Sequence, residues 1–304
     1  MTKQYNIMIL GGSGFIGRNL CRYLSQRGHR VSVFDLFPPE QPVEGVTYLQ
    51  GDFFTGAALE TVTAGQDVVI HALSTINPGN SNRVYMRGYE QDFIQTLKLF
   101  ELACAQKIRV LFLSSAGTIY GQYDGTPFTE SHPLMPINHY GSIKVCVETA
   151  MRSFNRQQDG KLFSCRISNP YGPGQDYRKG VGFIDAVVRN VLENSRLEIW
   201  GDGNVVRDYI YIEDVCAALE KIMEYEGSYD TFNISTGTGH SQLEILEIFR
   251  RLGCEVHPEF LPSRSVDASI NIVSNKLAEQ ELGIRFRKLE DGLPQYLRHL
   301  KMIS

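Results

Sequence analysis

Tyr140 and Lys144 could together carry out acid–base chemistry. Residues four apart share one face of a helix. A phenol has a pKa near 10 and is a poor base at neutral pH, but a lysine ammonium one turn away stabilises the phenolate and lowers that pKa. The pair therefore predicts a general acid/base that acts on an alcohol. The same spacing also arises by chance, so an exposed helical pair is the alternative.

A glycine-rich turn could hold a dinucleotide. Gly11, Gly14 and Gly17 follow a short apolar stretch at 5–10 and precede a helical pattern. The first glycine permits a tight turn, the second lets the backbone approach a pyrophosphate, and the third lets helix and strand pack closely. The helix N-terminus then offers N–H groups to the anion. The alternative is a tight turn without a ligand.

Asp35 ends the next apolar stretch at 30–35, about 20 residues beyond the turn. A carboxylate at that distance is placed to bind the adenosine ribose hydroxyls, and it would repel the 2′-phosphate of NADP. No basic residue follows at 36–38. The sequence therefore predicts NAD as the cofactor.

Alternating strands and helices must position these residues. The apolar stretches are near-continuous, as expected for parallel strands buried on both faces. Strands are expected at 5–10, 30–35, 47–52, 67–73, 109–115 and 162–168, and helices at 15–27, 56–64, 82–106 and 140–156. This rhythm predicts an α/β fold, a Rossmann-type doubly wound parallel sheet over residues 1–170, with sheet strands also possible from beyond residue 200.

The regular alternation of strands and helices ends near residue 170. Short strands are expected at 197–200, 206–210, 231–236 and 257–262, among helices at 180–194, 213–225, 241–252, 274–282 and 288–300. We expect residues 171–304 to form a smaller α/β C-terminal domain over the carboxyl ends of the strands, where such folds bind substrate.

Composition narrows the class of protein. The 304 residues carry a net charge of −4 with no basic stripe, so we expect no nucleic-acid partner. We expect no membrane span, because no apolar run is long enough, and no metal site. The six cysteines form no C-x-x-C pair, which favours free thiols and a cytoplasmic location. Helices at 92–106 and 143–154 have apolar residues on more than one face, so they either pack a second subunit or lie buried in the monomer.

With these motifs in order, the chain resembles the extended short-chain dehydrogenase/reductases, and in particular their nucleotide-sugar epimerase branch. The runs that carry the resemblance are 114–121 (Ser-Ser-Ala-Gly-Thr-Ile-Tyr-Gly), 166–174 (Arg-Ile-Ser-Asn-Pro-Tyr-Gly-Pro-Gly), 201–203 with 207–214, and 232–237. It spans residues 5 to about 285. These motifs are specific for the superfamily and much less so for the substrate.

The resemblance implies a role for each matching residue. NAD would contact Gly11, Ser13, Gly14, Phe15, Ile16, Gly17, Asp35, Asp52, Phe53, Ala72, Leu73, Ser114, Tyr140 and Lys144. The nucleotide sugar would contact Asn169, Trp200, Arg207, Arg264 and Asp267. Trp200 would stack on the base, with a core tryptophan as the alternative, and the two arginines would hold the diphosphate, with surface charges as the alternative.

Three positions depart from the family pattern. Ala116 stands where the family has a catalytic Ser or Thr, so Thr118 or Ser115 would have to supply the hydroxyl, and Thr118 is preferred. Asp92 replaces an asparagine of the preceding helix. Asn271 occupies a position that limits pocket size in some 4-epimerases, and a modest side chain there would admit a bulky 2-substituent.

We therefore expect an NAD-dependent epimerase that acts at C4 of a nucleotide sugar, a UDP-hexose or UDP-N-acetylhexosamine, in a homodimer. The resemblance implies a role in polysaccharide precursor synthesis. One alternative is an NAD(P)H-dependent nucleotide-sugar 4-reductase. Another, motivated by Ala116, is an NAD-binding sensor or scaffold with reduced catalysis. Dehydratases are disfavoured because residues 116–118 contain no carboxylate.

Overall fold

A computed structural model describes residues 3–55, 59–179, 182–262 and 270–303. Its centre is a seven-stranded sheet in the order β10-β6-β5-β4-β1-β2-β3, with every neighbouring pair parallel. The strands are β1 Asn6–Leu10, β2 Arg30–Asp35, β3 Thr47–Gln50, β4 Val68–His71, β5 Arg109–Ser115, β6 Leu162–Ile167 and β10 Thr231–Ile234. This confirms the Rossmann-type doubly wound fold. The order reverses between β1 and β4, and ligands of such sheets bind at that point.

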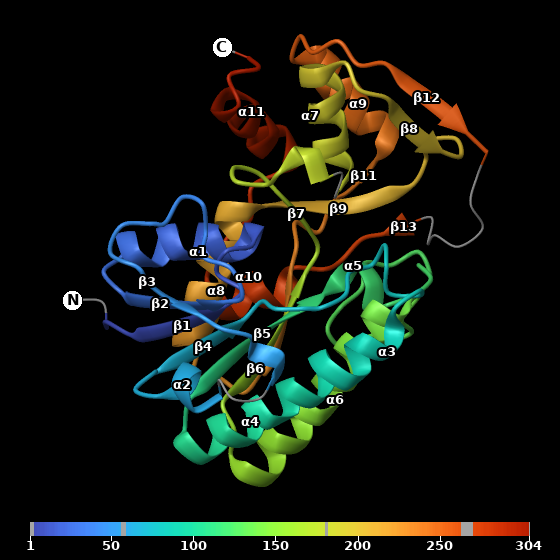
Figure 1. Ribbon diagram of the computed structural model, residues 1–304. Coiled ribbons are helices and arrows are strands. Elements are labelled where there is room, and N and C mark those ends of the chain that lie inside the picture. The colour runs from blue at the N-terminus through green and yellow to red at the C-terminus, as the bar shows by residue number, and fades with distance from the viewer. Residues whose placement is uncertain (1–2, 56–58, 180–181, 263–269, 304) are drawn as a thin grey trace.

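Helices cover both faces of the sheet (Figure 1). One face carries α1 Phe15–Gln26, α8 Ile212–Glu224 and α10 Lys276–Leu282, and the other carries α2 Leu59–Thr63, α4 Ile94–Gln106 and α6 His139–Gln158. Alternate strand residues serve the two faces: Ile7 and Ile9 pack toward α1, whereas Met8 and Leu10 pack toward α4. The strands therefore read as continuous apolar runs, as the sequence predicted.

A second, smaller unit lies beyond the carboxyl ends of the strands (Figure 1). Its core is formed by α7 Phe183–Glu193, α9 Gln242–Arg251 and α11 Leu289–His299, packed against the two-stranded sheet of β8 Leu197–Trp200 and β12 Pro258–Leu261. Between the two units runs a small sheet in which β9 Val206–Tyr211 pairs with β7 Asn169–Tyr171, β11 Gly239–Ser241 and β13 Ile270–Asn271.

The expected single helix at 82–106 is interrupted. It consists of α3 Tyr85–Arg87, a π-helical segment η2 Gly88–Phe93, and α4. A Cβ on Gly88 would overlap Ile76 and Ile143, so the chain passes very close to its neighbours there. The wider turn of a π segment often occurs at functional sites, and this one carries Asp92. Periodicity alone cannot reveal such a change within a continuous helical run.

Several short elements escaped the sequence prediction: α5 Ala116–Ile119, η1 Phe53–Thr55, η3 Tyr177–Lys179, β7, β11 and β13. Each is only two to four residues long, too short for a period to register. Because β10 and α8 join the first unit from beyond residue 200, a boundary at residue 170 describes the chain order better than the packing. The division at 170 stays a prediction.

Candidate active site

The glycine turn is built as the spacing predicted. Gly11 has φ +87°, which only glycine adopts readily, and its N–H donates to the Phe34 carbonyl. A Cβ on Gly17 would overlap the Gly11 carbonyl oxygen, whereas one on Gly14 would meet only that oxygen at 3.4 Å. Helix α1 begins after Gly14 without a side-chain cap or an acidic first turn. The turn thus leaves an uncapped, positively polarised helix end beside open space, which fits a bound pyrophosphate.

Asp35 lies beside this turn. Its Oδ2 accepts the Ser13 N–H at 3.0 Å and its Oδ1 accepts the Leu36 N–H at 2.8 Å. Phe15 and Ile16 begin α1, and their side chains pack against the apolar core on the α1 face. The carboxylate is therefore fixed between the turn and the end of β2, as ribose recognition requires.

The loops after β3 and β4 complete the wall of this crevice. Phe53 is buried and packs on His71 at 5.2 Å between ring centroids, so its side chain is not available to a ligand. Asp52 accepts the Phe54 N–H at 2.9 Å. Ala72 donates its N–H to the Leu10 carbonyl, and the Leu73 side chain closes over Gly11.

Asp92 organises the segment after β4. Its carboxylate accepts the Thr75 N–H at 2.9 Å and the Ser74 hydroxyl at 2.5 Å. His71 is buried beside it, with Nε2 at 2.9 Å from the Thr96 hydroxyl, and burial lowers its pKa to about 3, so it is neutral. Asp92 stands where the family pattern has an asparagine, so this chain has a buried carboxylate against the segment that follows β4.

Tyr140 and Lys144 share one face of α6, with Lys144 Nζ 5.2 Å from the Tyr140 ring centroid. Nζ donates to the Leu113 carbonyl at 2.9 Å, and burial lowers the pKa of Lys144 to about 8. The expected lowering of the Tyr140 pKa is wrong for this structure. Burial, reinforced by the charge of Asp92, raises it to about 12.

The turn after β5 brings the candidate hydroxyls to α6. Thr118 is buried and its Oγ1 has no hydrogen-bond partner, while its carbonyl accepts the Ile137 N–H and lies against Gly141. Ser115 is half-buried and begins α5. Ala116 is fully buried in a small apolar cluster. An unpaired buried hydroxyl is costly and uncommon, so Thr118 is well suited to a ligand partner.

A buried ion pair anchors this turn at both ends. Arg166 Nη2 binds Glu148 Oε2 at 2.6 Å, and Glu148 Oε1 accepts the Ser114 hydroxyl at 2.6 Å. Arg166 Nη1 also donates to Tyr120, whose hydroxyl donates to Asn233. The Ser114 side chain is thus committed to Glu148, and only its backbone is placed to meet NAD. The sequence prediction missed Glu148 and Arg166, although Tyr140, Lys144, Glu148 and Arg152 recur every four residues.

The predicted sugar-nucleotide residues line one cavity of about 270 Å3. It is bounded by Asn169 from β7, Trp200 from β8 and Arg207 from β9. Asn169 donates to the Asp208 carbonyl at 2.7 Å, with its Oδ1 near Gly117 of the catalytic turn. Arg264 and Asp267 lie outside the described residues. Asn271 donates to the Ala116 carbonyl at 3.3 Å, so it borders the same turn.

Two further residues of this cavity were not predicted. Asp185 on the first turn of α7 and Gln242 at the start of α9 each have a buried oxygen without a hydrogen-bond partner, Oδ2 and Oε1 respectively. No motif marks either position in the sequence.

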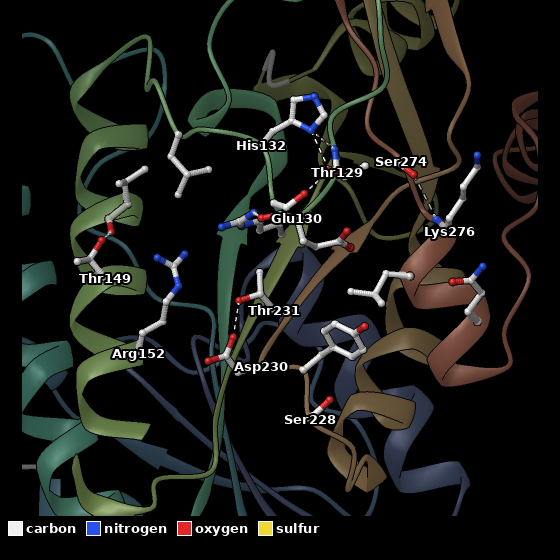
Figure 2. A pocket seen from close by; sticks show the side chains of 17 residues that line it. Thr129, Glu130, His132, Thr149, Arg152, Ser228, Asp230, Thr231, Ser274 and Lys276 are labelled. Carbon is white, nitrogen blue, oxygen red and sulfur yellow. Dashed lines mark hydrogen bonds between the residues drawn. The ribbon is translucent and has the colours of Figure 1, made fainter. Parts of the chain in front are cut away.

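A larger cavity of about 900 Å3 lies elsewhere (Figure 2). It opens between α6, with Thr149 and Arg152, and α10, with Lys276, beside the edge strand β10. None of the predicted site residues lines it. Its polar side chains largely bond to one another, as in the Thr129–His132 and Asp230–Thr231 pairs. Its volume alone therefore assigns it no ligand.

The strand order, the glycine turn at the switch point and the Tyr–Lys helix together define a dinucleotide-binding oxidoreductase fold. The profile of the NAD dependent epimerase/dehydratase family matches residues 7–235. The chain belongs to this family, and NAD is its cofactor.

Relatives agree on the family and differ in reaction. A dTDP-4-dehydro-6-deoxyglucose reductase from Escherichia coli is 30% identical over 99% of both chains. A UDP-glucose 4-epimerase from Halalkalibacterium halodurans is 28% identical over 91% of this chain and 89% of its own. The structure of a UDP-glucose 4-epimerase from Thermotoga maritima with UDP-glucose superposes with a TM-score of 0.90 at 28% identity, over 98% of this chain and 99% of the other.

Two general features complete the description. Within the described ranges no helix combines the length and the apolar character that crossing a bilayer requires. All six cysteines belong to those ranges and have free thiols, four of them buried.

Proposed function

We propose that the chain is an NAD-dependent C4 epimerase acting on a nucleotide sugar, a UDP-hexose or UDP-N-acetylhexosamine. The observation that carries the proposal is the arrangement of two sites around one turn. The Thr118 carbonyl lies against Gly141, the residue after Tyr140, and Asn169 of the cavity with Trp200 and Arg207 has its Oδ1 near Gly117. In this proposal the sugar of a nucleotide bound in that cavity lies at the Tyr140 phenol.

In this mechanism Tyr140 removes the proton of the C4 hydroxyl as the carbonyl forms, and returns it when the hydroxyl is regenerated. Lys144 holds a positive charge one turn away, and Thr118 is the second hydroxyl available to the sugar oxygen. Bound NAD would supply reversible hydride transfer at C4. Gly11, Ser13, Gly14, Gly17 and Asp35 would hold it, with the backbone of Asp52, Phe53, Ala72, Leu73 and Ser114 along the crevice. The net reaction is redox neutral.

The test supplies purified protein with UDP-glucose or UDP-N-acetylglucosamine and no added NAD, and follows the C4 epimer by NMR. We expect turnover in the wild type and a loss of at least about a hundredfold in Tyr140→Phe, because general acid–base catalysis contributes that much. Unchanged turnover in Tyr140→Phe would refute the mechanism.

The second candidate is a nucleotide-sugar 4-reductase. It is favoured by the 30% identical reductase relative and by the buried methyl group of Ala116 in place of a hydroxyl. A reductase consumes one reduced nicotinamide for each 4-keto sugar, whereas an epimerase consumes none. Steady NADH oxidation with a dTDP-4-keto-6-deoxyhexose, without epimer formation from any nucleotide sugar, would replace the first proposal by the second. NAD binding without either reaction would favour the sensor or scaffold.

We also propose that two copies pair along α4 and α6, which lie side by side (Figure 1). On α4, Ile94 is 44% exposed and Leu97 is half-buried, and on α6 Cys146 is half-buried. Light scattering of the wild type and of Ile94→Glu tests this proposal, and a monomeric wild type would refute it.

A further inference from the structure

The cavity of Asn169, Trp200 and Arg207 contains a buried acid, Asp185, that neither base stacking nor diphosphate binding requires. Asp185 is 1% exposed and lines this cavity from the first turn of α7. Its Oδ1 accepts the Tyr296 hydroxyl of α11 at 2.8 Å, which fixes the carboxyl group in one orientation. Its Oδ2 has less than 1 Å2 of exposed surface and no hydrogen-bond partner.

Such an oxygen needs a partner that the protein does not supply. An unsatisfied buried acceptor destabilises the folded protein, and more so when it is charged. Arg207 and Trp200 also line this cavity. The groups with resolved effects are Tyr296, which binds Oδ1, and Asp176, whose negative charge opposes ionisation. A ligand that brings an N–H group to Oδ2 would satisfy it, whereas a phosphate would be repelled.

We propose that Asp185 is a specificity-determining residue of this cavity, whose Oδ2 accepts a hydrogen bond from the ring N–H of a pyrimidine base, with Tyr296 as its positioning residue. This inference rests on the proposed function, which puts a nucleotide in the cavity and its base on Trp200. Uracil and thymine have a ring N–H at N3, while cytosine has an acceptor there. The geometry therefore selects uridine or thymidine nucleotides over cytidine nucleotides.

The direct test measures the affinity of the full-length protein for UDP and for CDP by calorimetry at about pH 8. We expect the wild type to bind UDP more tightly than CDP. Asp185→Asn should weaken UDP binding by about ten- to a hundredfold, the range for a hydrogen bond to a charged acceptor. CDP binding should hold or improve, because the new amide can donate to the cytosine ring nitrogen.

Matched variants separate the possible failures. Asp202→Asn makes the same chemical change on an exposed carboxylate near Trp200 and should alter neither affinity. Trp200→Ala should weaken UDP and CDP alike. If Trp200→Ala weakens UDP binding and Asp185→Asn does not, the inference is wrong and the nucleotide site stands. If the wild type binds no nucleotide, or Trp200→Ala and Arg207→Ala change nothing, both proposals fall.

A second measurement does not depend on the folding of a variant. Burial and the nearby charge of Asp176 raise the pKa of Asp185 to about 7. An N–H donor favours the ionised carboxylate, so UDP binding below about pH 7 should release a proton, which calorimetry in two buffers detects. Proton uptake, or no proton transfer in the wild type, would overturn the inference.

Tyr296→Phe should weaken UDP binding more than CDP binding.

Discussion

The buried polar groups that anchor the turn after β5 are paired with one another, whereas two in the cavity lined by α7 have no hydrogen-bond partner. The turn is anchored by Glu148 and Arg166, whose charged atoms bind each other, Ser114 and Tyr120. The cavity keeps Asp185 Oδ2 and Gln242 Oε1 without partners. Removing one member of a buried ion pair lowers the stability of the fold, because the other charge is left uncompensated. A buried polar group without a partner is available to bind a ligand. Substitution of Glu148 or Arg166 should therefore cost stability, whereas substitution of Asp185 or Gln242 should cost recognition.

The largest effect is expected at the anchored turn. Arg166→Met leaves the Glu148 carboxylate buried without its main cation, which should lower the free energy of unfolding by about 3–5 kcal/mol. Urea denaturation measures this loss. Arg152→Met is the matched control, because that side chain is 42% exposed and only 3.4 Å from the same carboxylate, so its loss should stay below about 1 kcal/mol. Equal losses of unfolding free energy in Arg166→Met and Arg152→Met would contradict this prediction.

The second effect is a pH dependence at the cavity. Burial raises the pKa of Asp185 to about 7 in the folded protein, from 3.8 for a freely solvated aspartate, so the protonated acid adds stability that is complete below about pH 4 and lost as the pH rises through 7. Asp185→Asn cannot ionise and should gain stability relative to the wild type over that window, by at most about 4 kcal/mol. Unfolding curves with a constant difference between about pH 4 and 8 would contradict this.

The third effect separates function from stability within one residue type. Thr118→Val removes a hydroxyl without a partner, so turnover should fall by about ten- to a hundredfold while the free energy of unfolding changes by less than about 1 kcal/mol. Thr96→Val removes a hydroxyl that donates to the Asp92 carbonyl and pairs with His71. This control should lose about 1–2 kcal/mol of stability. Equal changes in the free energy of unfolding of Thr118→Val and Thr96→Val would contradict this prediction.

The smallest effect concerns Asp92. Its charge raises the pKa of Tyr140, so Asp92→Asn should shift the pH profile of turnover toward lower pH, on the order of one unit. The amide can still accept the Thr75 N–H, which limits any structural loss. Steady-state rates between about pH 6 and 10 measure the shift. A shift toward higher pH would contradict this prediction, because the charge of Asp92 raises the pKa of both Tyr140 and Lys144.

The positions of the main strands, the glycine turn and the acid at 35 followed from the sequence because each depends on local rules. Continuous apolar runs mark strands buried on both faces, and Gly11 requires a positive φ wherever the turn occurs. The short strands β7, β11 and β13 were missed, since pairing partners distant in sequence define them. The π segment before α4 was missed because periodicity does not reveal it within a continuous helical run.

Among the site residues, sequence spacing identified Tyr140 and Lys144 as one face of a helix, and the resemblance brought Asn169, Trp200 and Arg207 together. Only the tertiary structure showed where their partners lie. Lys144 is directed to Leu113, and burial with the charge of Asp92 raises the pKa of Tyr140, which spacing alone would have lowered. The roles of Glu148 and Asp185 also depend on tertiary contacts, because a carboxylate in the sequence does not reveal whether it will be buried, or beside what.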